Sequence, residues 1–426
     1  MPGLHITTLG CKLNQFDSAE LAGTLRGELT LAQEPGSARL IVVNTCTVTS
    51  QADADARQIL RRRRRENPEA LIVATGCYAE RDPSALAALP EVDVVLRRED
   101  RPHAARLILE GLRRRFPSEM ADGCADRLAE SSLPDFGDRS RAFLRVQEGC
   151  DLVCSYCVIP SVRGPSRSVP IPEVVERFRS LRDAGYREIV LTGVNSGDYG
   201  RDLPERRTLV DLLEALLRLE GDFRIRLNSV EPRRVTRDLV SLIAGEPRMA
   251  RHLQVPLQSG ADDVLRAMRR NYRSADYLEV ARALRESIPG VGLGVDVIVG
   301  FPAEGEREFD QTRRLLEEAG ATHLHVFSYS PRPGTASYGM KGVPPGEIHR
   351  RSERLRSLGR ELYGRFVSDQ TGRSLRALVL AGRRRDGRSR ALTSNFIEVA
   401  LEGDPLPNSW RDVTIRGMES GAAIAD

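Results

Sequence analysis

The chain has 426 residues, of which 40% are hydrophobic and 29% are charged, and its formal net charge is +4. This length and composition are typical of a globular protein with two or three domains. No apolar run approaches the roughly 20 residues that a membrane-spanning helix needs, and the first residues lack the basic and apolar regions of a secretory signal. We therefore expect a cytoplasmic protein without membrane contact. Its seven cysteines indicate metal ligation or catalysis and argue against a disulfide framework.

The first segment of the sequence alternates predicted strands with predicted helices. Strands are expected over residues 5–10, 38–45 and 70–76, and helices over about 15–28 and 50–65. The second and third of these strands are continuous apolar runs, which are typical of a parallel sheet buried on both faces. The segment is therefore predicted to form a parallel-sheet α/β domain.

A cysteine lies just beyond the carboxyl end of each of these three strands. The cysteines are Cys11, Cys46 and Cys77, separated by 35 and 31 positions in the chain. Because ligands bind at that edge of an open parallel sheet, the three can meet there. Three thiolates on one edge favour an iron–sulfur cluster. The alternative is three buried structural cysteines, since free cysteine is among the most buried residue types.

The middle of the chain begins with a segment of turn composition and continues as repeated strand–helix units. Residues 117–140 show no hydrophobic periodicity, and we expect a linker there. Cys124 in this linker has no partner at metal-ligand spacing and is interpreted as an incidental thiol. Beyond it, six units predict an incomplete α/β barrel. Their strands are expected over residues 142–147, 187–193, 223–229, 252–256, 293–300 and 322–330.

The run EGCDLVCSYC places three closely spaced cysteines after the first barrel strand, at the edge where barrel active sites lie. Cys150, Cys154 and Cys157 can hold three irons of a [4Fe-4S] cluster, which leaves the fourth iron open to a substrate. An open iron can bind the amine and carboxylate of S-adenosylmethionine (SAM), and this spacing is the signature of radical-SAM enzymes. The alternative is a zinc knuckle, although zinc motifs are usually Cys-x2-Cys pairs that occur in twos.

The tail of the chain, residues 368–426, consists of short expected strands separated by turns, which predict a small β-barrel. Arginines on one expected hairpin suit contact with a nucleic-acid backbone. They are Arg383, Arg384, Arg385, Arg388 and Arg390. The alternative is a barrel that only caps and solubilises the protein.

Taken together, these features resemble the methylthiotransferase family of radical-SAM enzymes over essentially the whole chain. The segments that carry the resemblance are TLGCKLNQFDS, NTCTVT, TGCYAE, EGCDLVCSYCVIPSVRGPSRS, HLQVPLQSG, MRRNY, DVIVGFPAE and FSYSPRPGT. The resemblance implies an α/β protein with an N-terminal parallel-sheet methylthiotransferase domain at 1–116 and a linker at 117–140. A central partial (βα)6 radical-SAM barrel at 141–367 and a C-terminal small β-barrel of the TRAM RNA-binding type at 368–426 follow.

The resemblance also implies the cofactors, which are SAM and two [4Fe-4S] clusters. Cys150, Cys154 and Cys157 would hold the radical-SAM cluster, and Cys11, Cys46 and Cys77 the second one. In this family, one-electron cleavage of SAM gives a 5′-deoxyadenosyl radical that activates C2 of an adenine. The second cluster carries the sulfur that is inserted, and another SAM methylates it.

Three segments, TLGCKLNQ, RGPSRS and HVFSYSPRPGT, are most like the branch that methylthiolates N6-threonylcarbamoyladenosine at position 37 of tRNA. The alternatives within the family are N6-isopentenyladenosine in tRNA and an aspartate of a ribosomal protein. An RNA-binding protein with two structural clusters is disfavoured, because a structural cluster gains nothing from an open iron. Expected partners are tRNA, an electron donor of the flavodoxin or ferredoxin type, and a sulfur source.

Four further residues are candidates for contact with SAM: Asn195, Gln258, Ser259 and Asp296. Asn195 follows the second barrel strand, where radical-SAM enzymes contact the SAM amino group, and a buried turn residue is the alternative. Gln258 and Ser259 end the fourth strand, and Asp296 lies in the fifth. These three either contact SAM or only order this edge of the barrel.

Overall fold

The computed structural model describes residues 1–120, 133–137, 139–419 and 421–426. Cys124 and most of the expected linker lie outside these residues. The chain divides into two compact units, residues 1–137 with 157–165 and residues 138–156 with 166–426. No helix among the described residues combines the length and the apolar character needed to cross a membrane.

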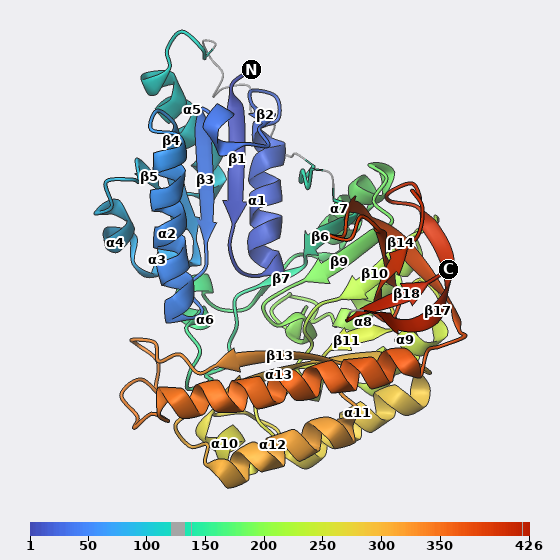
Figure 1. Ribbon diagram of the computed structural model, residues 1–426. Coiled ribbons are helices and arrows are strands. Elements are labelled where there is room, and N and C mark those ends of the chain that lie inside the picture. Colours follow the sequence, from blue (N-terminus) through green and yellow to red (C-terminus); the bar gives the residue numbers. More distant parts are fainter. Residues whose placement is uncertain (121–132, 138, 420) are drawn as a thin grey trace. The chain divides into compact units, whose positions relative to one another are not determined.

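The first unit is built on a five-stranded parallel sheet with the order β2-β1-β3-β4-β5 (Figure 1). Its strands are β1 (Gly3–Thr8), β2 (Thr30–Leu31), β3 (Leu40–Thr45), β4 (Leu71–Gly76) and β5 (Val94–Val95). The three expected strands are β1, β3 and β4, so the parallel-sheet α/β fold predicted here is confirmed. The edge strands β2 and β5 are too short to produce a sequence pattern.

Helices cover both faces of this sheet, which explains why its central strands are apolar throughout. Val42 of β3 belongs to one core cluster with Leu109, whereas its neighbour Ile41 belongs to another with Leu60. Successive strand residues point to opposite faces, so both faces of β3 are buried. The helices are α1 (Lys12–Leu25), α2 (Ser50–Glu66), α3 (Cys77–Arg81), α4 (Pro83–Ala87) and α5 (Ala104–Arg115).

The second unit contains six parallel strands in the order expected for an incomplete α/β barrel. Hydrogen bonds join β10-β9-β6 in one sheet and β11-β12-β13 in another. A parallel bridge between Ser229 and Gln254 connects the two sheets. The strands are β6 (Arg141–Arg145), β9 (Glu188–Thr192), β10 (Arg224–Leu227), β11 (His252–Gln254), β12 (Gly292–Val299) and β13 (His323–Ser328). All six overlap the predicted strands, so the predicted partial barrel is confirmed.

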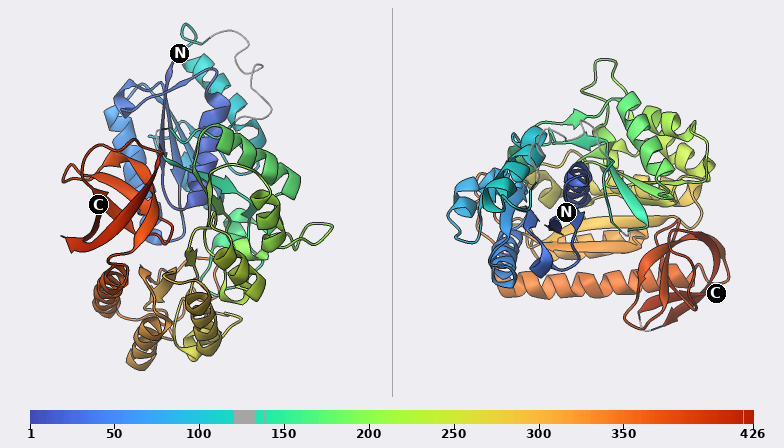
Figure 2. Two further views of the ribbon diagram at one scale, coloured as in Figure 1. Left: turned by 90° about the vertical axis from the view of Figure 1, so that its right-hand side faces the viewer. Right: turned by 90° about the horizontal axis from the view of Figure 1, so that it is seen from above.

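Helices alternate with these strands along the chain. They are α7 (Ile171–Asp183), α8 (Leu209–Leu217), α9 (Arg237–Gly245), α10 (Asp262–Ala267), α11 (Ser274–Ser287) and α12 (Glu306–Ala319). The last helix, α13 (Pro345–Ser368), has 24 residues and leads into the C-terminal strands (Figure 2).

The C-terminal strands form a closed barrel with the order β14-β15-β16-β18-β17. They are β14 (Ser374–Arg383), β15 (Ser389–Thr393), β16 (Glu398–Leu401), β17 (Trp410–Glu419) and β18 (Ala422–Ala425). The predicted small β-barrel is therefore confirmed. Its first strand starts six residues after the expected boundary, because α13 continues through Ser368.

Two arginines of β10 attach the barrel to the parallel strands of the second unit. The Arg224 and Arg226 guanidiniums donate to the carbonyl oxygens of Leu392 (2.9 Å) and Thr393 (3.1 Å) in β15. Both also donate to the Glu188 carboxylate on the neighbouring strand β9, at 2.6 Å and 2.9 Å. Glu188 is completely buried, so its carboxylate provides the counter-charge for this interface.

The ionisation of Glu188 depends on these arginines. Burial alone would raise the pKa of its carboxyl group, but the charges of Arg226, Arg224 and Arg141 outweigh burial and hold that pKa well below the usual value of 4.5. A carboxyl group with a depressed pKa in the folded state stabilises the fold above its unfolded-state pKa. That contribution is lost as the pH falls through the folded-state pKa.

Replacing Glu188 by glutamine should lower the free energy of unfolding by about 3–5 kcal/mol at pH 7, because it leaves buried guanidiniums without their counter-charge. The difference from the unmodified protein should shrink in acid, below about pH 4.5, where linkage removes the advantage of the carboxylate. Chemical denaturation at several pH values measures both effects. The control is Glu173→Gln, which breaks a half-exposed pair with Arg177 and should cost less than about 1 kcal/mol. Equal stability of the two variants would contradict the role of Glu188.

Candidate functional site

The three N-terminal cysteines lie at the carboxyl ends of three neighbouring strands. Cys11 directly precedes α1, Cys46 directly follows β3, and Cys77 opens α3 after β4. Because β3 lies between β1 and β4, the thiols come to one edge of the sheet. Cys11 influences the pKa of both other thiols, which places the three within electrostatic reach of one another.

Two glycines allow the chain to turn into these cysteines at close quarters. Gly10 and Gly76 have φ angles of +91° and +94°, in the region that favours glycine. A Cβ on Gly10 would lie 3.0 Å from Cys46 Sγ, and a Cβ on Gly76 would lie 2.4 Å from the Thr45 carbonyl oxygen. The Gly-Cys sequence at both strand ends is therefore a condition for this approach.

Asn14 and Arg163 form a buried polar network at this edge. The Asn14 side-chain amide donates to the carbonyl oxygens of Leu9 (2.8 Å) and Thr45 (3.0 Å), which follow or end two neighbouring strands. Arg163 is only 3% exposed. It donates to the Asn14 amide oxygen and lies 3.3 Å from the Asp17 carboxylate. The network thus fixes a guanidinium next to the strand-end cysteines.

Arg163 also acts on the thiols themselves. Burial raises the pKa of Cys77 to about 11 and raises that of Cys46, and the charge of Arg163 opposes both shifts. Its side chain is also in hydrogen-bond contact with Cys77. Since thiols must lose their protons to ligate a metal, a buried cation beside them favours the ligating form. Arg163 ends α6 (Ile159–Arg163), in the segment 157–165 of the first unit.

In the second unit, Gln147 organises the loop that carries Cys150. It lies in β7 (Gln147–Glu148), which pairs with β8 (Arg167–Ser168) and closes the base of the loop. The fully buried side-chain amide of Gln147 donates to the carbonyl oxygen of Gly149 at 2.8 Å, and its oxygen accepts from the backbone N–H of Asn195 at 2.9 Å. One side chain therefore connects the cysteine loop to the segment after β9.

Arg270 is the polar partner of Cys154. Its side chain is 4% exposed and donates to Cys154 Sγ at 3.1 Å and to the Glu231 carboxylate. Burial raises the pKa of Glu231, and the charge of Arg270 opposes that shift. Burial also raises the pKa of Cys150 to about 11, and the charges of Cys154 and Glu231 add to the effect. Hydrogen bonds to cluster sulfurs tune the reduction potential, and Arg270 is placed to make one.

These surroundings fit ligation by iron–sulfur clusters. Within the described parts of the chain, no three His, Cys, Asp or Glu side chains converge tightly enough to hold a single metal ion. A four-iron cluster binds each thiolate through a different iron, so its ligands stand further apart than those of one ion. Thiolates are soft ligands suited to such clusters, and the buried guanidiniums of Arg163 and Arg270 can compensate their negative charge. The predicted ligands stay Cys11, Cys46 and Cys77 for one cluster and Cys150, Cys154 and Cys157 for the other.

Arg163 and Arg270 were not among the residues predicted from the sequence. Both lie far along the chain from the cysteine that each contacts, so no local spacing marks them. The available signal was the family resemblance, because Arg163 opens the segment RGPSRS and Arg270 lies in MRRNY.

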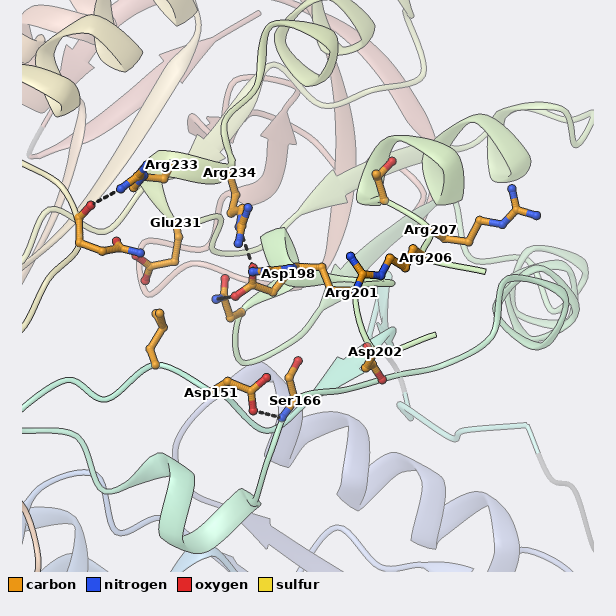
Figure 3. A pocket seen from close by; sticks show the side chains of 14 residues that line it. Asp151, Ser166, Asp198, Arg201, Asp202, Arg206, Arg207, Glu231, Arg233 and Arg234 are labelled. Atoms are coloured by element: carbon orange, nitrogen blue, oxygen red, sulfur yellow. Dashed lines mark hydrogen bonds and ion pairs between the residues drawn. The ribbon is translucent and has the colours of Figure 1, made fainter. Parts of the chain in front are cut away.

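A cavity of about 490 Å³ opens beside the cysteine loop of the second unit (Figure 3). Asp151 and Leu152, which follow Cys150, line part of it, and so do Asn195 after β9 and Glu231 after β10. The cavity therefore lies at the carboxyl ends of the parallel strands, where α/β barrels bind their ligands.

Asn195 is the one predicted SAM contact that lines this cavity. Its side-chain amide donates to Asp198 at 2.6 Å. Its buried amide oxygen has no hydrogen-bond partner among the residues that the structure describes. Buried polar atoms are rarely left unpaired, so this acceptor suits a ligand with an amino group.

The other three candidates for SAM contact lie elsewhere in the second unit. Ser259 is fully buried, and its hydroxyl lies 3.4 Å from that of Thr312 in α12. The Asp296 carboxylate in β12 lies 3.0 Å from His325 Nδ1. Gln258 has a φ of +64° and donates its backbone amide to the Asp296 carbonyl. None of the three lines the cavity described above, and their contact with SAM stays a prediction.

Comparison with known proteins supports the class that the fold and the cysteine loop define, that of radical-SAM proteins. The Radical SAM superfamily matches residues 144–316, and the Uncharacterized protein family UPF0004 matches residues 3–97. Among solved structures, the radical SAM methyltransferase TsrM from Kitasatospora setae is similar with a TM-score of 0.54 and 15% identity, over 77% of this chain and 73% of that one. The cobalamin-dependent radical enzyme OxsB matches with a TM-score of 0.51 and 12% identity, over 86% of this chain and 56% of that one. These structures show the fold.

Sequence relatives define the family more closely. The threonylcarbamoyladenosine tRNA methylthiotransferase MtaB of Aquifex aeolicus is 36% identical over 93% of this chain and 96% of its own length. The protein of the same name from Bacillus subtilis is 35% identical over 93% and 89%. A tRNA-2-methylthio-N(6)-dimethylallyladenosine synthase from Parafrankia sp. is 35% identical over 94% and 81%. The chain belongs to the radical-SAM methylthiotransferase family, and the resemblance found in the sequence is confirmed.

Replacing Arg163 by glutamine should lower the reduction potential of the cluster expected on the strand-end cysteines, because losing a buried positive charge disfavours the added electron. A lost interaction of about 1.4 kcal/mol corresponds to about 59 mV for one electron. A redox titration followed by EPR measures the shift. It is done with Cys150, Cys154 and Cys157 changed to alanine, so that only one cluster titrates.

The matched control for this titration is Arg106→Gln. Arg106 pairs with Glu110 at 2.9 Å on the exposed side of α5 in the same unit, and its loss should leave the potential within experimental error. Arg163→Lys, which keeps the charge but not the guanidinium geometry, should give an intermediate potential. A potential that is the same for Arg163→Gln and Arg106→Gln would rule out the electrostatic role.

Proposed function

We propose that this protein is a radical-SAM methylthiotransferase that adds a methylthio group to C2 of N6-threonylcarbamoyladenosine at position 37 of tRNA. The observation that carries the proposal is the presence of two separate cysteine groups, each beside a buried guanidinium. One group suits the cleavage of SAM and the other the supply of sulfur, and a methylthiotransferase needs both. The relative from Aquifex aeolicus, which is similar over 96% of its length, bears the name of this activity.

The side chains of this protein position the reactants. When bound, SAM and the two clusters supply the radical chemistry and the sulfur. Asn195 is placed to accept a hydrogen bond from the amino group of SAM. Gln147 holds the cysteine loop against the segment that carries Asn195, and Arg270 fixes Cys154 relative to Glu231. The cavity beside them is large enough for part of a modified nucleoside.

A second candidate substrate is the tRNA adenosine with an N6-dimethylallyl (isopentenyl) group. The Parafrankia relative named for that substrate is 35% identical, so overall identity does not separate the two activities. The cavity favours the threonylcarbamoyl group, because most of the residues that line it are charged and can pair with a polar or ionised substituent. The partners that we propose are tRNA, an electron donor of the flavodoxin or ferredoxin type and a sulfur source, in the cytoplasm.

We also propose the domain boundaries expected from the sequence: a methylthiotransferase domain at 1–116, a linker at 117–140, a radical-SAM domain at 141–367 and a TRAM-type RNA-binding barrel at 368–426. The hairpin arginines of the barrel contribute less free positive charge than their number implies, since most of them pair with carboxylates. The pairs are Arg383–Asp404 (2.7 Å), Arg384–Asp386 (3.3 Å), Arg388–Asp386 (2.9 Å) and Arg390–Glu398 (2.6 Å). Arg385 is exposed and forms no ion pair with any described residue.

Changing Cys150, Cys154 and Cys157 together to alanine should halve an iron content of about eight per chain and abolish SAM cleavage, because the open iron that binds SAM is lost. Changing Cys11, Cys46 and Cys77 together should also halve the iron but leave SAM cleavage, while methylthiolation disappears. Iron analysis, 5′-deoxyadenosine release and nucleoside mass spectrometry measure the three quantities. Persistent 5′-deoxyadenosine release from the first variant would show that the radical-SAM assignment is wrong.

Replacing Arg385 by glutamine should reduce the salt dependence of tRNA binding by about one phosphate contact, because each neutralised phosphate releases a counterion. Binding measured at several salt concentrations gives the slope of log affinity against log salt. The matched control is Arg388→Gln on the same hairpin, whose charge is already paired with Asp386 and Glu419. Slopes that agree for both variants and the unmodified protein would favour a barrel that only caps the second unit.

A further inference from the structure

We propose that Arg269, Tyr338 and Lys341 form a surface that binds the RNA strand next to the target adenosine. Tyr338 stacks on a neighbouring base, and the two cations each contact a phosphate. We name it the Ser155 surface, because Ser155 anchors the segments that carry it. The inference rests on the proposed function and identifies residues that hold the substrate strand. Aromatic rings together with cations are the means by which proteins bind single-stranded nucleic acid.

Ser155 connects two distant segments to the cysteine loop of the second unit. It directly follows Cys154, and its backbone N–H donates to the carbonyl oxygen of Met268 at 3.0 Å. Its hydroxyl donates to the carbonyl oxygen of Ala267 at 2.8 Å. Its own carbonyl oxygen accepts from the backbone N–H of Ser337 at 2.8 Å. The turn after α10 and the loop between β13 and α13 (orange in Figure 1) are therefore held beside the cysteine loop.

Tyr338 directly follows Ser337 and is 54% exposed. Its hydroxyl and ring make no hydrogen bond or ring contact with the residues that the structure describes. The loop beneath it is nevertheless fixed. The Tyr338 backbone N–H donates to the Thr335 carbonyl oxygen at 3.1 Å, and the Tyr329 hydroxyl donates to the Ser337 carbonyl oxygen at 3.0 Å. An exposed ring on a fixed loop offers a flat apolar face that needs little ordering on binding.

Arg269 directly follows Met268, and its side chain is exposed. Its φ is +58°, in the left-handed region that residues other than glycine rarely adopt. Strained positions of this kind are concentrated at ligand sites. The next residue, Arg270, is buried and donates to Cys154 and Glu231. The strained turn thus places one arginine beside an expected cluster ligand and leaves its neighbour in contact with solvent.

The charge of both segments is purely positive. Residues 264–275 and 319–346 contain no aspartate or glutamate. Lys341 is exposed in the second of these segments, and Arg269 in the first. Neither cation forms an ion pair with a residue that the structure describes. Cations with uncompensated charge beside an exposed aromatic ring suit the phosphates and bases of an RNA strand.

The Ser155 surface is separate from the cavity in Figure 3, because none of its three residues lines that cavity. The carboxylate of the cysteine loop, Asp151, lines the cavity and accepts from the Ser166 backbone N–H at 2.9 Å. A target base in a single-stranded loop is splayed out to reach the reacting group. The nucleotides on either side of it then lie over the surroundings of the cysteine loop, where Tyr338 can stack on one of them.

The test uses the full-length protein with both clusters and an anticodon stem-loop RNA that carries threonylcarbamoyladenosine. In two further RNAs the base on the 5′ side or on the 3′ side of the target is removed. The abasic nucleotide keeps the number of phosphates constant. Fluorescence anisotropy gives the affinities at equal iron content. Removing the base that stacks on Tyr338 should weaken binding about 5- to 150-fold, the range of stacking on an aromatic side chain.

The variant Tyr338→Leu keeps an apolar side chain on the loop but has no aromatic face. It should bind the intact RNA more weakly by the same factor. Its penalty for the abasic nucleotide should fall to about twofold or less, because two groups that contact each other are coupled in a double-mutant cycle. Tyr338→Phe keeps the ring and should keep the penalty. No penalty in the unmodified protein, or an equal penalty in Tyr338→Leu, would overturn the inference.

The two cations are tested by the salt dependence of binding. Arg269→Asn, whose side chain tolerates the left-handed backbone, and Lys341→Gln should each lower the slope of log affinity against log salt by about one phosphate contact. Both should keep the abasic penalty. The matched control is Arg266→Gln, because Arg266 already pairs with Asp263 at 2.8 Å, and its slope should be unchanged. Equal slopes in all three variants would overturn the inference for the cations.

Two further measurements separate this surface from an electron-donor site and from failure of the proposed function. If Tyr338→Leu binds every RNA like the unmodified protein but is reduced more slowly by flavodoxin, the surface serves the electron donor and the inference is wrong. Mass spectrometry of the intact RNA after reaction tests the proposed function. Absence of the methylthio product with the unmodified protein would refute that function, whereas product formation with an abasic penalty unchanged in Tyr338→Leu would refute only the Ser155 surface.

Discussion

Compensation of buried charge by arginine is the interaction on which both units of this protein depend. Arg224 and Arg226 hold the barrel to the parallel strands only because the buried carboxylate of Glu188 balances them. In the two cysteine groups the arginines are the compensating charges. Arg163 and Arg270 are buried cations beside thiols that become anionic when they ligate a metal. Removing one partner of such a set costs far more than the pair contributes in net stability. Arginine side chains therefore hold the barrel to the parallel strands in one place and lie beside the expected cluster ligands in another.

Parallel strands impose the second constraint, which decides where chemistry can occur. Every parallel strand ends at the same edge of its sheet, so side chains far apart in sequence gather there. Cys11 and Cys46 lie at such an edge in the first unit, and Asn195 lies at one in the second. Close approach then depends on backbone without side chains, as Gly10 and Gly76 show. Both units therefore place their candidate functional side chains at the edge where parallel strands end.

Much of this arrangement could be predicted from the sequence, because periodic patterns and strand-end cysteines are local signals. The parallel strands of both units and the C-terminal barrel follow from apolar runs and turn residues. Partners across long separations could not be predicted in this way, and Arg163, which lies 149 positions from Asn14, is the clearest case. The number of arginines on the barrel hairpin also does not predict how much of their positive charge is unpaired. The run of hairpin arginines looks like a phosphate surface in sequence, but acids such as Asp386 and Glu398 pair with most of it.

In the second unit, buried side chains hold the cysteine loop. The cysteine loop has one arrangement that supports ligation, and Gln147 and Arg270 fix it from buried positions. Relatives with equal overall identity to this chain bear names for different N6 substituents. Identity over the whole chain therefore does not separate the two substrates.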